Sequence, residues 1–120
     1  MLTHAVEDDL DLDRDPWEMA NLYPRDTGLR HTVWVSPRGR ARHDARVKVC
    51  MAPGDRMDPD NLAVMSIRPT PRLLHGELPP RDEMAVRAWI ELNAPLLLGY
   101  WEGTVSTVEL AKGLQTISPE

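Results

Sequence analysis

Two stretches near the middle of the chain alternate between apolar and polar residues. They span residues 32–36 and 46–51, and an alternation with period two is typical of strands that bury one face. We therefore predict that these stretches form an antiparallel pair. The side chains expected to face a core are Val33, Val35, Val47, Val49 and Met51.

A third apolar run covers residues 62–67, and residues 72–75 are long enough for one further short strand. Pro69 and Pro71 precede this fourth segment, and proline cannot donate a hydrogen bond to a neighbouring strand. We therefore predict that the fourth strand lies at an edge of the sheet.

The spacing of apolar residues becomes helical after Gly76. Prolines and acids at residues 79–83 are typical of a first helical turn, and a broad apolar stripe follows them. Pro95 predicts either a kink or a new helix with Asn93 as its N-cap. Residues 106–109 form a capping box, which predicts a last short helix.

These patterns predict an α+β fold, a small and mainly antiparallel sheet of three or four strands packed by the C-terminal helices. A chain of 120 residues has room for one domain, which we assign to residues 28–120. Residues 1–27 are predicted to be an acidic, flexible leader. A short helix over residues 16–23 would begin at Asp15 and stop at Pro24, and it either packs on its own domain or serves as a docking motif.

The charged residues are arranged in blocks. Residues 1–27 carry eight acidic and two basic side chains, residues 28–56 carry two and seven, and residues 57–120 carry nine and five. The formal net charge is −5 at pH 7, which argues against nonspecific binding along nucleic acid. Blocks of opposite charge either neutralise each other or each bind a partner.

The acidic leader is the first candidate binding segment. Aspartates at near-alternate positions can imitate a phosphate backbone or occupy a basic groove of a partner, and a tryptophan adds an apolar anchor. The alternative is a tail that only promotes solubility. The predicted partner-binding residues are Asp8, Asp9, Asp11, Asp13, Asp15 and Trp17.

The connection between the two central strands is the second candidate, because it is the most basic stretch of the chain. Arginine forks match phosphate oxygens, and strand alternation would place the next two cations together on an exposed face, where Trp34 could stack a base. The alternative is that the acidic leader neutralises these cations. The predicted nucleic-acid or phosphate-binding residues are Arg38, Arg40, Arg42, His43, Arg46 and Lys48.

Catalysis has weaker support in the sequence. A ribonuclease would use His31 or His43 as general base and Tyr100 or His75 as acid, but the sequence does not indicate that these residues converge. Cys50 lies within a predicted strand, where a buried thiol is expected rather than a nucleophile. We therefore predict no catalytic residues and favour a non-enzymatic role.

No cofactor or metal site is predicted. Acids cluster at residues 55–61 without the glycine and glutamate of a calcium loop, and zinc spacings and a glycine-rich phosphate cradle are missing. No apolar run approaches the ~20 residues of a membrane span, and acids stand where a signal peptide needs basic residues. With Cys50 as the single cysteine, these features favour a cytoplasmic protein and leave its oligomeric state open.

Three motifs occur together in the C-terminal third: H-G-E-L-P at residues 75–79, W-I-E-L-N at 89–93 and L-L-G-Y-W at 97–101. They resemble a bacterial family of small domains of unknown function, whose helix carries a W-I-x-x-H/N and L-L-x-x-W signature. The family's genes often lie near predicted toxin–antitoxin genes. The resemblance implies a short sheet followed by a helix, with Trp89 and Trp101 packing that helix on the sheet.

The segments N-L-Y-P-R-D-T-G-L at residues 21–29 and V-W-V-S-P-R-G-R-A-R-H at 33–43 resemble uncharacterised proteins of plasmids and integrative elements. The chain departs from the first family in three ways. Only His43 corresponds to a histidine-rich N-P-P-H-F-H strand entry, Pro95 interrupts a helix that is normally continuous, and the acidic leader is extra. The resemblance transfers no catalytic residue.

We therefore predict a non-enzymatic interaction module of a mobile-element or toxin–antitoxin-type system. It would bind a protein partner through charge complementarity. The alternatives are a nucleic-acid-binding protein or ribonuclease toxin that acts through the basic connection, and an acidic inhibitor of a host defence nuclease.

Overall fold

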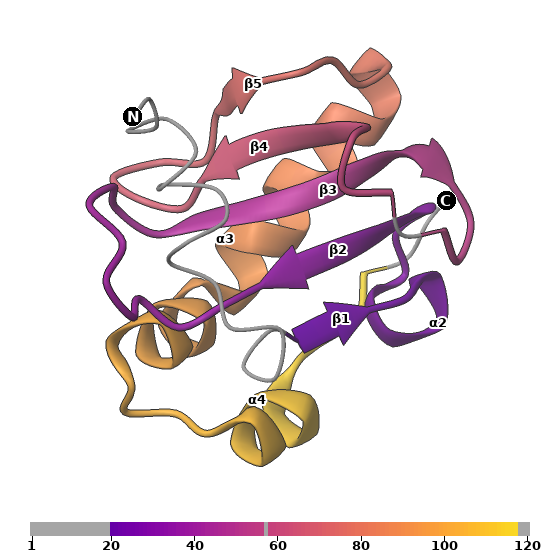
Figure 1. Ribbon diagram of the computed structural model, residues 1–120. Coiled ribbons are helices and arrows are strands. Elements are labelled where there is room, and N and C mark those ends of the chain that lie inside the picture. Colours follow the sequence, from indigo (N-terminus) through magenta and orange to yellow (C-terminus); the bar gives the residue numbers. More distant parts are fainter. Residues whose placement is uncertain (1–19, 57, 118–120) are drawn as a thin grey trace.

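The computed structural model describes residues 20–56 and 58–117. Its five strands form one sheet in which each strand is antiparallel to its neighbours and the order follows the sequence (Figure 1). The strands are β1 (Ala20–Leu22), β2 (His31–Val35), β3 (Arg46–Pro53), β4 (Leu62–Ser66) and β5 (Leu73–His75). The helices are α2 (Pro24–Thr27), α3 (Pro80–Glu102) and α4 (Thr107–Gly113).

The central strands place alternate side chains in the main core, as their alternation predicts. Val33 of β2 lies opposite Val49 of β3, and Val47 of β3 lies opposite Met65 of β4. All four side chains belong to the main hydrophobic core. The predicted antiparallel pair and its core-facing valines are confirmed, and β5 lies at an edge of the sheet as expected.

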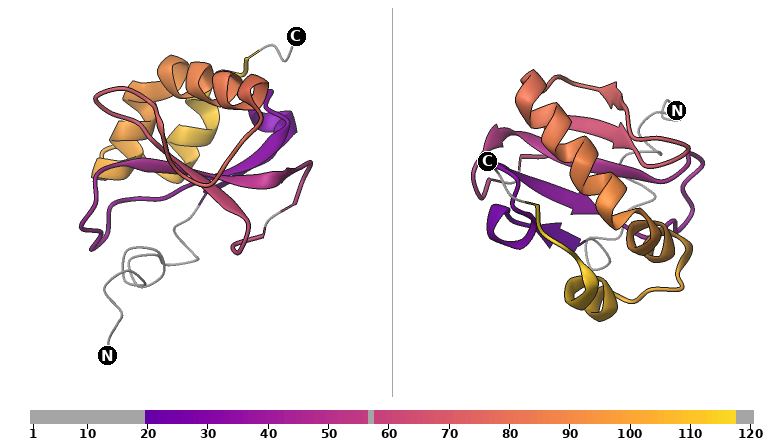
Figure 2. Two further views of the ribbon diagram at one scale, coloured as in Figure 1. Left: turned by 90° about the horizontal axis from the view of Figure 1, so that it is seen from above. Right: turned by 180° about the vertical axis from the view of Figure 1, so that it is seen from behind.

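The C-terminal helices cover one face of the sheet. Figure 2 shows α3 and α4 on the same side of it, with α3 crossing the central strands. Val86, Trp89 and Ile90 form the most deeply buried stripe of α3, and Leu110 anchors α4. This arrangement confirms the α+β fold and the packing of the sheet by the C-terminal helices.

Helix α3 continues through Pro95 as one helix of 23 residues. A new helix with Asn93 as its N-cap does not occur, because the Asn93 carboxamide has other partners. Its Nδ2 donates to the carbonyl oxygens of Trp89 and Gln115, both at 3.0 Å, and its Oδ1 accepts from the Gln115 N–H at 2.8 Å. Asn93 therefore ties α3 to the segment that follows α4.

The helix predicted over residues 16–23 is wrong for the residues that the structure describes. Residues 20–22 form β1, in which the two outer side chains are buried and that of Asn21 is exposed. Helix α2 begins at Pro24, the residue expected to stop a helix, because proline suits a first helical position. The sheet therefore gains a fifth strand inside the segment assigned to the leader.

Truncation of the main α3 anchor, Trp89→Ala, should lower the free energy of unfolding by about 3–5 kcal/mol, because a fully buried indole would leave a cavity. Met84→Ala on the same helix is the matched control. The Met84 side chain is 68% exposed, so we expect a change within about 0.5 kcal/mol. Urea unfolding followed by circular dichroism measures both values, and similar losses for the two variants would contradict the packing described above.

Candidate functional site

The arginine loop, residues 36–45 between β2 and β3, is attached to the last turn of α3. The Arg38 N–H donates to the carbonyl oxygen of Trp101 at 2.8 Å, and the Ala41 N–H donates to the carbonyl oxygen of Arg38 at 2.8 Å. Ala41 and Ala45 are buried. The backbone of this connection is therefore held at several points, and its long side chains extend from an anchored base.

Three arginines at alternate positions of this loop point away from the core. Arg38, Arg40 and Arg42 are exposed. In the part of the chain that the structure describes, none of the ion pairs involves these three guanidinium groups. They therefore form a local concentration of positive charge on a protein whose net charge is negative.

His43 does not extend outward with the arginines. Its ring lies 5.5 Å from that of Trp101, centroid to centroid, at an angle of 31°, and its Nδ1 is 2.8 Å from the Asp44 carbonyl oxygen. The side chain is half-buried. His43 therefore packs the loop against α3.

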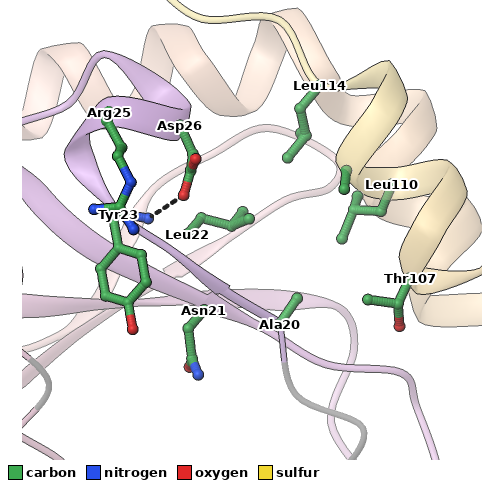
Figure 3. A pocket seen from close by; sticks show the side chains of 10 residues that line it. Ala20, Asn21, Leu22, Tyr23, Arg25, Asp26, Thr107, Leu110 and Leu114 are labelled. Atoms are coloured by element: carbon green, nitrogen blue, oxygen red, sulfur yellow. Dashed lines mark hydrogen bonds between the residues drawn. The ribbon is translucent and has the colours of Figure 1, made fainter.

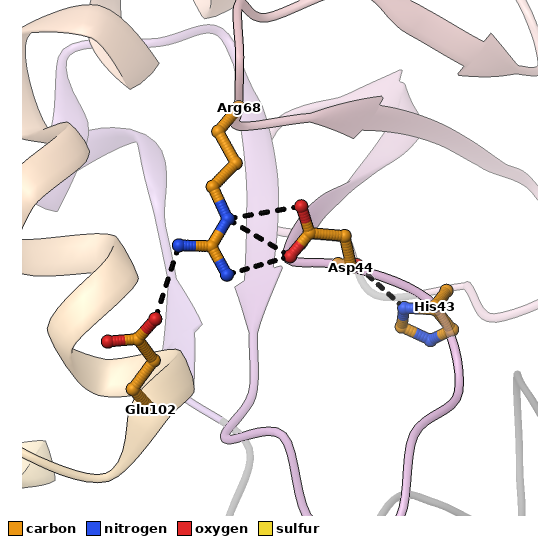
Figure 4. Close-up of polar contacts among 4 residues, drawn as sticks. All are labelled: His43, Asp44, Arg68 and Glu102. Atoms are coloured by element: carbon orange, nitrogen blue, oxygen red, sulfur yellow. Dashed lines mark hydrogen bonds and ion pairs between the residues drawn. The ribbon is translucent and has the colours of Figure 1, made fainter.

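An ion-pair network holds the end of the loop (Figure 4). The Arg68 Nη2 lies 2.9 Å from the Asp44 carboxylate, and its Nη1 lies 3.2 Å from that of Glu102 in α3. The Arg68 Nε also donates to both Asp44 oxygens at 3.1 Å. One guanidinium thus connects the segment after β4, the arginine loop and the end of α3.

Arg46 and Lys48 lie on the sheet face opposite Val47 and Val49, as the alternation predicts. Both cations were expected to be exposed on this face. This expectation is wrong for Lys48, which is only 7% exposed. Trp34 lies opposite Lys48 on the same face and is only 5% exposed. An indole with so little exposure offers no accessible face on which a base could stack. The binding role of Arg38, Arg40, Arg42, His43, Arg46 and Lys48 stays a prediction, and the three loop arginines are its exposed members.

The two candidate general bases, His31 and His43, lie at opposite ends of α3. His31 is buried, with its Nδ1 2.8 Å from the Cys50 carbonyl oxygen and its Nε2 3.3 Å from the carboxylate of Asp82 in the first turn of α3. His43 contacts the last turn of that helix. A rise of 1.5 Å per residue separates the two turns by about 28 Å. Tyr100 is buried with its hydroxyl 3.1 Å from that of Thr107, which leaves it no access to a substrate.

The cluster of acids between β3 and β4 has a local structural role. The Asp58 carboxylate accepts the Asp60 N–H at 3.0 Å, and the Asp58 carbonyl oxygen accepts the Asn61 N–H at 3.0 Å, as in an ordinary turn. Among residues 20–56 and 58–117, no three potential ligands lie close enough to hold a metal ion.

A groove of about 620 Å³ separates β1 from α4 (Figure 3). Leu22 on one side faces Leu110 and Leu114 on the other, while Tyr23 and Arg25 stand at one end, with the guanidinium carbon 4.7 Å from the ring centroid. The residue pattern gave no sign of this groove, because residues 20–22, which form its first wall, were expected to be helical. The register of Ala20 and Leu22 with residues of β2 creates that wall.

The predicted binding residues of the leader lie outside the described residues. Their role therefore stays a prediction, as does their neutralisation of the basic block. These residues are Asp8, Asp9, Asp11, Asp13, Asp15 and Trp17.

Comparisons of this chain with protein-family models, with curated proteins and with solved structures found no match. The resemblance to a toxin–antitoxin-associated family therefore stays an expectation from its motifs. Among the described residues, no helix combines the length and the apolar character needed to cross a membrane.

We predict that the contact between Arg68 and Asp44, which holds the end of the arginine loop, weakens in acid. Hydrogen bonds from the Arg68 guanidinium hold the pKa of Asp44 below its usual value of 3.8. A depressed carboxyl pKa contributes stability that is present above that usual value and is lost as the pH falls through the lower pKa of the folded protein. Arg68→Gln should raise the pKa of Asp44 towards 3.8, as measured by carbon NMR of the side-chain carboxyl.

Glu102→Gln is the matched control for this titration, because it leaves the hydrogen bonds between Arg68 and Asp44 in place. We expect it to change the pKa of Asp44 less than Arg68→Gln does. A larger change from Glu102→Gln would contradict the assignment. The effect on stability should be small and should decrease with salt, because both carboxylates are about half exposed.

Proposed function

We propose that this protein is a non-enzymatic interaction module that binds a protein partner through charge complementarity. The observation that carries the proposal is the exposure of Arg38, Arg40 and Arg42 on a loop whose backbone is anchored to α3. An anchored loop loses little entropy on binding, and arginine forks recognise carboxylates in a bidentate geometry. The complementary partner is a protein with an acidic surface.

A protein partner is favoured over nucleic acid for two reasons. Binding of single strands relies on accessible aromatic rings, and among the described residues the indoles of Trp34 and Trp101 are each only 5% exposed. The carboxylates of Asp44 and Glu102 also lie beside the loop and limit the extent of its positive charge, whereas a nucleic-acid backbone needs a longer run of cations. A short, geometrically specific contact with an acidic patch fits this surface better than a continuous phosphate track.

We propose a non-enzymatic role because the candidate catalytic side chains are buried or held in structural contacts. His31 and Asp82 are paired but nearly inaccessible, with side-chain exposures of 3% and 5%. His43 packs on Trp101 at the far end of α3. As candidate general bases, His31 is therefore inaccessible to a substrate, and His43 is held by its contacts with Trp101 and the Asp44 carbonyl oxygen.

The biological setting is the part of the proposal that rests on the sequence motifs alone. We place the module in a mobile-element or toxin–antitoxin-type system because of the motifs at residues 89–93 and 97–101. An acidic inhibitor of a defence nuclease would use the leader instead of the arginine loop, so the two ideas predict different sensitive residues.

A triple variant should no longer capture the partner from a lysate of the source organism. It combines Arg38→Ser, Arg40→Ser and Arg42→Ser. The intact protein should retain the partner after nuclease treatment. It should release the partner as salt increases, because added salt shortens the Debye length below its physiological value of about 8 Å and weakens the attraction between exposed charges. Quantitative mass spectrometry of the captured proteins measures both effects.

The matched control replaces Arg56, Arg72 and Arg81 by serine, since these arginines are also exposed and the change in net charge is the same. It should capture the partner as the intact protein does. Equal losses in both variants would indicate only a general charge effect and would contradict the assigned site. Capture that disappears after nuclease treatment would replace the protein partner by nucleic acid.

A further inference from the structure

The outer side of α3, which is turned away from the sheet, carries a row of apolar side chains. Met84, Ala88 and Leu92 follow one another at intervals of four residues, and all three are exposed. This interval places them in one ridge along the helix. In the view from behind in Figure 2, α3 lies in front of the sheet and no other helix or strand passes over it. We call these three residues the outer ridge.

The outer ridge is unusual for a helix that covers a sheet. Such a helix normally has polar or charged residues on its outer side, because that side faces water. Four large apolar side chains of the described residues are exposed, and Met84 and Leu92 are two of them, at 68% and 42%. Pro95 continues the row by a further turn and is exposed as well. Apolar side chains that gather in one row, rather than occurring singly, are typical of an interaction surface.

The charges on the same side of α3 are separated along the helix. Arg81 precedes Ala88 and Glu91 follows it, and both are exposed. Within residues 20–56 and 58–117, neither takes part in an ion pair. The neighbouring Arg87 and Glu83 neutralise each other at 2.9 Å. A row that is positive before its centre and negative after it complements the same row running in the opposite direction.

We propose that the outer ridge is the contact surface for a second copy of this chain. The two α3 helices run in opposite directions and are related by a two-fold axis at Ala88. This axis places Met84 of each copy against Leu92 of the other, because a two-fold contact uses the same surface twice. A parallel arrangement would instead bring like charges together.

The residue at the centre of the ridge suits this crossing. The methyl group of Ala88 lets the helix axes approach to about 8 Å, the short end of the range for packed helices. Ridges of residues four apart interdigitate at a crossing angle of about −50°, the commonest class of helix packing. Arg81 of one copy and Glu91 of the other are then separated by about 8 Å along the contact, which their long side chains can span.

The inference goes beyond the proposed function and has a consequence for it. The arginine loop is attached to the last turn of α3, so an antiparallel dimer places its two loops at opposite ends. From Ala88 to Glu102 the helix rises about 21 Å in each copy, which separates the two loops by about 40 Å. The dimer is therefore bivalent towards a partner that has two acidic surfaces.

Disulfide cross-linking of the full-length protein tests the direction of the two helices. M84C mixed with L92C should form a linked heterodimer under mild oxidation, and A88C should form a homodimer, because these pairs oppose each other across the axis. M84C or L92C alone should cross-link about tenfold more slowly. V108C is the matched control, since Val108 is 61% exposed on α4 and should also cross-link slowly. The native Cys50 is completely buried and should not react.

Sedimentation equilibrium measures the strength of the contact. M84S/L92S should raise the dissociation constant of the dimer by about tenfold or more, because it removes the apolar side chains at the centre of the interface. L74S/V108S is the matched control and should leave the constant unchanged, since it alters two exposed apolar residues elsewhere. Circular dichroism checks the folding of each variant. Unfolding of the dilute monomer does not report on this contact.

A charge exchange on the full-length protein tests the proposed ion pairs between copies. R81E and E91R should each weaken the dimer, because each variant places like charges opposite one another. The double variant R81E/E91R should restore the dissociation constant, since it only reverses the order of the two charges. Failure of the double variant to recover would contradict the proposed pairing.

The remaining outcomes decide between this contact and its alternatives. A protein that sediments as a monomer at every accessible concentration would overturn the proposal, as would equal effects of M84S/L92S and L74S/V108S. Cross-linking of M84C with itself that is faster than its cross-linking with L92C would overturn the antiparallel arrangement. Each arginine loop binds its partner by itself, so loss of the dimer leaves partner capture in place. The triple arginine variant likewise leaves the dimer in place, and failure of either proposal is recognised separately.

Discussion

The packing of α3 on one face of the sheet is the interaction on which the remaining features depend. Trp89 occupies the middle of this contact and is completely buried, although its Nε1–H has no hydrogen-bond partner among residues 20–56 and 58–117. An unpaired buried donor costs about 1–3 kcal/mol, whereas full burial of a large aromatic side chain contributes more than that. Volume rather than hydrogen bonding therefore places this residue.

The same helix organises both ends of the molecule. Asp82 in its first turn lies 3.5 Å from Arg30 and 3.3 Å from His31, where a carboxylate also suits the positive end of the helix dipole. Glu102 in the last turn is unfavourable for the dipole, and Arg68 compensates it. The Trp101 carbonyl oxygen then accepts the N–H of Arg38, so the position of the arginine loop follows from the position of α3.

Local patterns predicted most of the secondary structure. Alternation located β2 and β3, and an apolar run located β4. The capping box located α4 because Ser106 and Glu109 satisfy each other's backbone N–H groups. The expectation that was wrong, a helix over residues 16–23, failed because contacts between distant segments decide the structure there. A strand of three residues has almost no signal of its own, and β1 exists because β2 pairs with it.

For the candidate site as well, some features could be predicted from the sequence and others depended on tertiary contacts. The clustering of Arg38, Arg40 and Arg42 in one loop was evident from the chain, and so was the side of β3 on which Lys48 lies. Whether a side chain on a given face is exposed depends on what lies over that face, which residue spacing does not encode. His43 illustrates the same limit, because its ring packs on Trp101, which is 58 positions away in the sequence.

The amino-acid sequence by itself determined the α+β class, the faces of the central strands and the separation of charge into blocks, because these depend on residue order over a few positions. Only the tertiary structure decided that β1 joins the sheet, that α3 continues through Pro95 and that Lys48 is buried. These outcomes depend on contacts between distant segments. Burial and pairing are properties of the assembled sheet and helices, whereas alternation and charge are properties of the chain.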